Sequence, residues 1–135
     1  MTALAAFGLL VIRLVVGLTF AAHGAQKLFG WFGGHGLQGT GGFFESIGIK
    51  PGKTMALLAG LSEVAGGLLF AVGFLTPLAA LLIIGTMVVA IMKVHGPNGY
   101  WVTQNGTEYN VMLIVVALGV ALIGAGSFSI DALLF

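Results

Sequence analysis

This sequence of 135 residues contains no cysteine and very few charged residues. Without cysteine, the chain cannot form disulfides, thiolate metal sites or thiol-based catalytic centres. Charged residues make up 7% of the chain and hydrophobic residues 59%, whereas a soluble domain has about 25% charged and about 45–50% apolar residues. The mean hydropathy is +1.12. So few polar side chains cannot cover a water-soluble globule, and the composition therefore indicates an integral membrane protein.

Clustered positive charge is also lacking. Lys and Arg number five against four Asp and Glu, which leaves a net charge of +1. A nucleic-acid-binding surface needs a cluster of basic side chains that displaces counterions from phosphates. The sequence therefore predicts no nucleic-acid partner and a lipid bilayer as the surroundings, and it leaves a homo-oligomer open.

Four apolar stretches fill most of the chain. Each approaches the ~20 residues that a helix needs to cross a bilayer, and their hydrophobicity is continuous, unlike the alternating pattern of barrel strands. The sequence predicts one all-α domain, 1–135, an integral membrane four-helix bundle with spans at about 3–22, 54–74, 78–94 and 108–124. The first stretch is interpreted as a mature helix, not a secretory signal, because it lacks a basic start and carries Arg13 within its apolar run. Gly17 with Ala21, and Ala56 with Gly60, have the four-residue spacing that lets membrane helices approach closely.

A loop rich in glycine and aromatic residues joins the first two spans. Its aromatic side chains include Trp31, Phe32 and Phe43. Aromatic rings favour the headgroup region of a membrane, so we expect this loop to lie at the interface, with a short amphipathic helix at Gly42–Ile47.

Lysines lie on one side of the predicted bundle only. The first and third loops share that side and carry Lys27, Lys50, Lys53 and Lys93, whereas the second loop and both tails have no Lys or Arg. By the positive-inside rule, the first and third loops are predicted to face the cytoplasm.

Arg13 and Glu63 lie inside predicted spans, where each costs at least about 2.5 kcal/mol on insertion scales. Arg13 precedes His23 by ten residues, or ~15 Å of helix, and Glu63 follows Thr54 by nine residues, or ~13 Å. Equal depth on neighbouring helices predicts an Arg13–Glu63 ion pair. Such a pair either fixes the helix register or takes part in function, and both interpretations stay open.

Other polar residues are predicted to gather at the membrane face that carries the first and third loops. Lysines there often extend to headgroups and tyrosines often anchor the interface, whereas His23 and His95 can donate, accept or titrate near neutral pH. No HExxH or ExxH spacing supports a metal site, so none is predicted. Gly48–Thr54 is one residue too short to match the phosphate-binding loop pattern, so no nucleotide site is predicted.

The predicted catalytic residues are Glu63, His23, His95 and Glu108, and the predicted substrate-binding residues are Arg13, Lys27, Trp31, Lys93, Trp101 and Tyr109.

Three segments closely resemble the DoxX family of small bacterial membrane proteins. They are HGAQKLFGWFGGHGLQGTGGFFESIGIKPG from His23, GLSEVAGGLLFAVGFLTPLAAL from Gly60 and MKVHGPNGYWVTQNGTEYN from Met92. The resemblance covers essentially the whole chain, including SFSIDALL near its end. It implies four membrane helices in a bacterial plasma membrane and an association with quinone-linked redox chemistry, but it supplies no established catalytic roles.

Three functions remain open from the sequence. The leading hypothesis is binding of a quinone or similar aromatic molecule in a polar cleft, with redox conversion supported by the donors and acids named above. No flavin, haem or iron–sulfur motif is recognisable, so the cofactor is unknown and electrons are expected from a soluble redox partner or an unseen cofactor. The alternatives are a non-enzymatic scaffold for a redox or oxidative-stress complex, and a small-solute or proton pathway.

Overall fold

The computed structural model describes residues 1–135 and is almost entirely helical, which confirms the predicted all-α class. Four long helices run along its long axis: α1 (Ala3–Phe29), α3 (Gly52–Val72), α4 (Thr76–Ala90) and α5 (Glu108–Ile123). α1, α3 and the segment Thr76–Asn98 are long and apolar enough to cross a membrane, and α5 is a shorter apolar helix. The chain thus has the helices of a membrane bundle.

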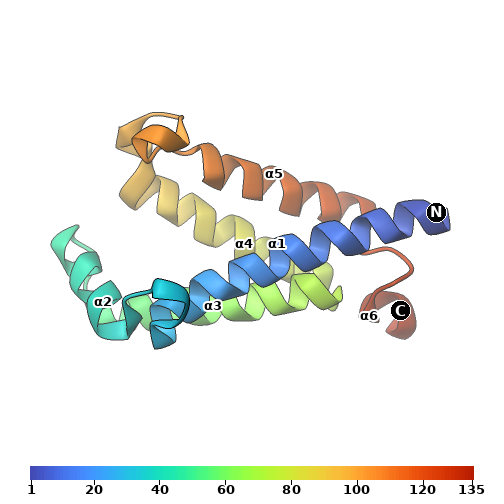
Figure 1. Cartoon of the computed structure of the whole chain (residues 1–135), viewed down its shortest axis with the longest axis horizontal. Helices are drawn as coiled ribbons and strands as arrows, with labels where there is room; N and C mark the ends of the chain where they lie inside the picture. The colour runs from blue at the N-terminus through green and yellow to red at the C-terminus, as the bar shows by residue number, and fades with distance from the viewer.

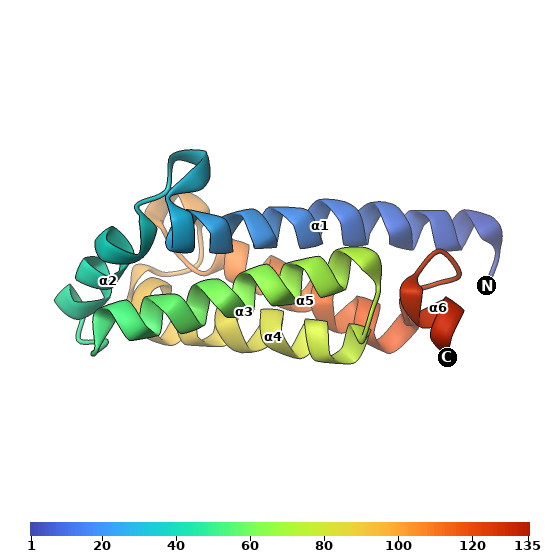
Figure 2. The ribbon, with the colours of Figure 1, turned by 90° about the horizontal axis from the view of Figure 1, so that it is seen from below.

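Two short helices mark the ends of this bundle. α2 (Gly36–Ser46) lies at one end, and α6 (Ile130–Leu134) lies with both termini at the other (Figures 1 and 2). We call these the α2 end and the α6 end. The helix expected at Gly42–Ile47 is thus present, but it begins six residues earlier.

α1 continues seven residues beyond the predicted end at Ala22. It stops at Phe29 because Gly30 takes the left-handed conformation (φ 74°) that commonly ends helices. His23, Gln26 and Lys27, which were assigned to the end of the span or the following loop, are therefore helical. Because of this extension, each residue of α1 lies opposite a different residue of α3 from the one predicted.

Glycines let α1 and α3 pack with their backbones in contact. A Cβ atom at Gly17 would lie 2.5 Å from the Gly67 carbonyl oxygen, and one at Gly24 would lie 2.6 Å from that of Gly60. These contacts confirm the close packing predicted from Gly17 and Gly60. α4 packs on α3 and α5 on α4, and the core between the helices is apolar, with Phe20, Phe70, Ile83, Met87 and Leu113 among its members.

Candidate functional site

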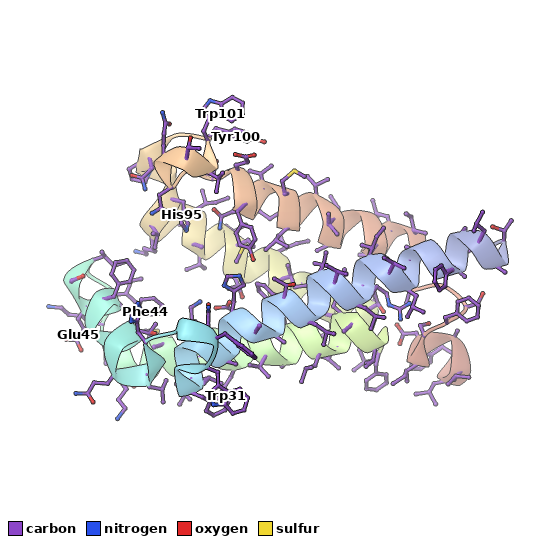
Figure 3. All side chains as sticks on the ribbon, in the orientation of Figure 1. Trp31, Phe44, Glu45, His95, Tyr100 and Trp101 are labelled. Carbon is purple, nitrogen blue, oxygen red and sulfur yellow. The ribbon has the colours of Figure 1, made fainter.

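A cavity of about 1050 Å³ opens at the α2 end among α1, α2, α3 and α4. Its walls come from residues at helical spacing, which share one face of each helix. On α3 they include Met55, Ala59, Ser62 and Glu63, and on α4 and the following turn Leu82, Thr86, Ala90 and Lys93. Figure 3 shows Phe44 on α2 and His95 beyond α4, two further lining residues, on opposite sides of this space.

The buried acid of this cavity is paired with a lysine. Glu63 is 2% exposed, and its Oε1 lies 2.6 Å from Nζ of Lys27 on α1. Side chains on a helix lean toward its N-terminus, so on antiparallel helices Lys27 leans inward and Glu63 leans toward the α2 end. The close Gly24–Gly60 contact brings the two backbones near enough for the charges to meet.

The predicted Arg13–Glu63 ion pair is therefore wrong. The prediction took His23 and Thr54 to be level, but the contacts place Gly24 beside Gly60 and Val64. Arg13 consequently faces the end of α3, where Ala71 and Gly73 lie, and not Glu63. The two residues do not form one polar floor.

Arg13 instead binds the C-terminal segment at the α6 end. Its guanidinium donates hydrogen bonds to the carbonyl oxygens of Ala125, of Phe128 (2.9 Å) and of Ala71 (3.3 Å). A buried charge needs such partners because burial without them is costly. The geometry gives Arg13 a role in holding the chain end and places it outside the cavity.

Asp131 of α6 completes this attachment, because it accepts hydrogen bonds from the first residues of α4. Its carboxylate accepts hydrogen bonds from the amide of Leu75 (2.7 Å) and from both the amide and the hydroxyl of Thr76 (3.0 and 2.6 Å). Burial raises the pKa of Asp131, but the bonds from Thr76 and Leu75, together with the Arg13 charge, hold that pKa below its ordinary value. We call Arg13, Asp131 and these partners the C-terminal clasp.

Lys93 and His95 reach the cavity from a π-helical turn, Ile91–His95, that follows α4. Such turns are frequent at functional sites because they redirect side chains. Nδ1 of His95 lies 2.9 Å from the carbonyl oxygen of Asn105. A carbonyl can only accept, so Nδ1 carries the proton, and Nε2 of a neutral ring is free to accept one.

The cavity gathers only some of the residues predicted from the sequence. Glu63, Lys27, Lys93 and His95 line it. His23 lies instead against Tyr109 of α5, with 5.6 Å between ring centroids. The carboxylate of Glu108 accepts a hydrogen bond from the amide of Val102 (2.8 Å) and so holds together the loop that precedes α5. Trp31 and Trp101 are exposed and project from separate parts of the surface (Figure 3).

Several lining residues were not predicted. α2 contributes Gly39, Thr40, Phe43 and Phe44, and the segment before it contributes His35. Their three- and four-residue spacing is a helical signal, but the many glycines before Gly42 limited the predicted helix to Gly42–Ile47, which includes only Phe43 and Phe44. Only tertiary packing shows that α2 turns this face toward α4.

Comparisons with known proteins identify relatives of this chain, two of which are described as membrane proteins. Residues 8–96 match the family model DoxX. The chain is 28% identical to "Putative oxidoreductase CatD" of Bacillus subtilis over 95% of this chain and 87% of the relative. It is 31% identical to inner membrane protein YqjF of Escherichia coli over 94% and 92%, and 30% identical to an uncharacterised membrane protein of Mycobacterium tuberculosis over 89% and 77%. No solved structure matches the chain.

Proposed function

This chain belongs to the DoxX family of membrane proteins, and from that premise we propose that the cavity at the α2 end binds a quinone or similar small aromatic molecule and supports its redox conversion. The observation that carries the proposal is a large, mainly apolar cavity whose lining includes an ion pair, a second lysine and a histidine. A relative's description as an oxidoreductase supports redox chemistry as the class of activity.

The cavity suits a ligand that is dissolved in the bilayer. Leu58 of α3 and Leu81 and Val89 of α4 line it and are exposed, so part of its wall is both open and apolar. An apolar molecule can therefore pass between lipid and cavity without crossing a polar barrier. Ligand sites typically measure about 300–1,000 Å³, so about 1050 Å³ accommodates a ring system with part of a side chain.

The polar groups match the two redox states of a quinone. A quinone carbonyl accepts hydrogen bonds, and the ammonium groups of Lys93 and Lys27 donate them. A quinol hydroxyl donates, and Nε2 of neutral His95 can accept from it. Conversion of quinone to quinol takes up two electrons and two protons. We assign proton transfer to Glu63 and His95 and expect electrons from a redox partner at the α2 end.

Binding to the purified protein tests this proposal. We expect saturable binding of 2-methyl-1,4-naphthoquinone in lipid nanodiscs, measured by equilibrium dialysis. His95→Ala should weaken binding of the corresponding quinol, measured under reducing conditions, about fivefold, because the quinol hydroxyl loses its acceptor and one hydrogen bond contributes about 1 kcal/mol. Glu63→Gln should change the affinity because Lys27 loses its counter-charge. Glu45→Gln is the matched control, since Glu45 is exposed on α2 and does not line the cavity.

The opposite results distinguish the alternatives. If wild type shows no saturable binding, the ligand site is wrong and a scaffold function gains support. If His95→Ala and Glu63→Gln both bind as tightly as wild type, the ligand lies elsewhere and this assignment of the cavity fails.

A further inference from the structure

We propose that the cavity selects the anionic form of its ligand, an aromatic molecule with an ionised oxygen such as a hydroxyquinone, and that Lys93 is the residue that selects it. This inference rests on the proposed function and narrows its ligand class. It comes from the positions of all charged side chains in the chain.

None of the four acidic residues of the chain pairs with Lys93. Glu63 is paired with Lys27, and Glu108 is bound to the backbone of its loop. Asp131 lies in the C-terminal clasp at the α6 end. Glu45 is exposed on α2 and is not among the lining residues. No carboxylate therefore lies within ion-pair distance of Lys93.

The cavity consequently has an excess of positive charge. Two lysines, Lys27 and Lys93, line it against the single carboxylate of Glu63. His35 and His95 are the other titratable groups in its walls, and neither can contribute negative charge. Lys93 is itself exposed, and a ring bound beside it would displace water from its ammonium group, where a charge is screened less than in open water. An anion in the cavity therefore gains attraction that a neutral ring lacks.

The apolar part of the cavity specifies the rest of the ligand. Phe43 and Phe44 of α2 line it together with Leu58 of α3 and Leu82 of α4, whereas Lys93 and His95 come from the turn that follows α4. A flat ring can contact the phenylalanines while its ionised oxygen reaches Lys93. A fatty acid would also present an anion but would lose the contacts between aromatic rings.

A matched pair of quinones tests this inference. At pH 7.5, 2-hydroxy-1,4-naphthoquinone is an anion, because its enolic hydroxyl is conjugated to a carbonyl, whereas the 2-methyl compound is neutral. We expect wild type in nanodiscs of zwitterionic lipid to bind the anion about tenfold more tightly, since a single contact between charges contributes about that factor. Lys93→Gln should remove this preference, because the uncharged amide can still donate a hydrogen bond but no longer attracts an anion, so binding of the hydroxyquinone should weaken about tenfold more than binding of the methyl compound.

Lys50→Gln is the matched control, because Lys50 is exposed at the same end but does not line the cavity. It should keep the tenfold preference. Equal binding of the two quinones by wild type, or a preference that survives Lys93→Gln, would overturn selection of the anion. Competition by laurate as strong as by the hydroxyquinone would overturn the aromatic assignment. If neither quinone binds, the proposed function itself fails, which is a separate result.

Discussion

Asp131 shows how one side chain joins two distant parts of the chain. A carboxylate that accepts three hydrogen bonds is stabilised in its charged form, so folding lowers the pKa of Asp131 below its ordinary value. Its contribution to stability is therefore fully present above the unfolded pKa and is lost as the pH falls through the folded pKa.

Asp131→Asn should accordingly destabilise the protein by about 1 kcal/mol at pH 7, the usual effect of losing a helix cap. The difference between wild type and variant should stay constant down to about pH 5 and shrink as the pH falls below about 4, the ordinary range for Asp. Reversible unfolding in mixed micelles at several pH values measures it. Comparing the two proteins cancels titration of groups that they share, and a difference that grows on acidification would contradict this role.

Residue-level prediction from the sequence identified the costly buried charges but not their partners. Arg13 and Glu63 were singled out correctly as groups that need compensation, and both are buried. Arg13 binds backbone carbonyls, which every sequence position offers equally, and Lys27 had an equally good interpretation as a residue that extends to headgroups. Composition and spacing do not distinguish these outcomes, because the partners are set by how the helices are aligned.

At the scale of helices, the alignment of α1 with α3 depends on glycine. A Cβ at Gly17 would lie within 3 Å of backbone atoms of both Gly67 and Ala71, which cannot move aside as a side chain can. Gly17→Ala should therefore separate the helices and destabilise the protein by about 2 kcal/mol, as overpacked cores do. Unfolding in mixed micelles measures this change.

Gly8→Ala is the control on the same helix. A Cβ at Gly8 would meet nothing within 4 Å, so this change should be neutral or stabilising by up to about 1 kcal/mol from helix propensity. Equal destabilisation by Gly17→Ala and Gly8→Ala would mean that the effect does not arise from the α1–α3 contact.

The existence of each long helix was predictable, but several ends were not. Continuous hydrophobicity predicted α3, α4 and α5 to within a few residues. α1 was cut short because polar residues were taken to end a span, whereas helix geometry depends on backbone conformation and the first left-handed residue is Gly30. The π-helical turn that places Lys93 and His95 leaves no recognisable pattern in the sequence.

On the scale of the whole molecule, the two polar regions lie at opposite ends of the bundle. The cavity lies at the α2 end and the C-terminal clasp at the α6 end (Figure 2). Polarity of the predicted loops placed the expected polar cleft at the α2 end, where the cavity lies. It was not enough to show that Arg13 belongs to the α6 end, because depth counted along separate helices carries no information about their relative shift.

The same asymmetry predicts how the molecule lies in the membrane. Lys27, Lys50, Lys53 and Lys93 are all toward the α2 end, whereas the α6 end has no Lys and only Arg13, which is buried. The positive-inside rule therefore places the α2 end in the cytoplasm. Because the chain has no cysteine, single cysteines can report this without background.

Gln38→Cys on α2 and Gln104→Cys in the loop before α5 are exposed at the α2 end, and Ser127→Cys is exposed at the α6 end. In intact spheroplasts, a membrane-impermeant maleimide should label Ser127→Cys only, and all three variants should react after lysis. The reverse pattern would place the cavity on the outer side. With the predicted pattern, the cavity exchanges protons with the cytoplasm and the expected electron donor must be a cytoplasmic protein, because Lys93 and His95 lie at the end of the bundle that such a donor can reach.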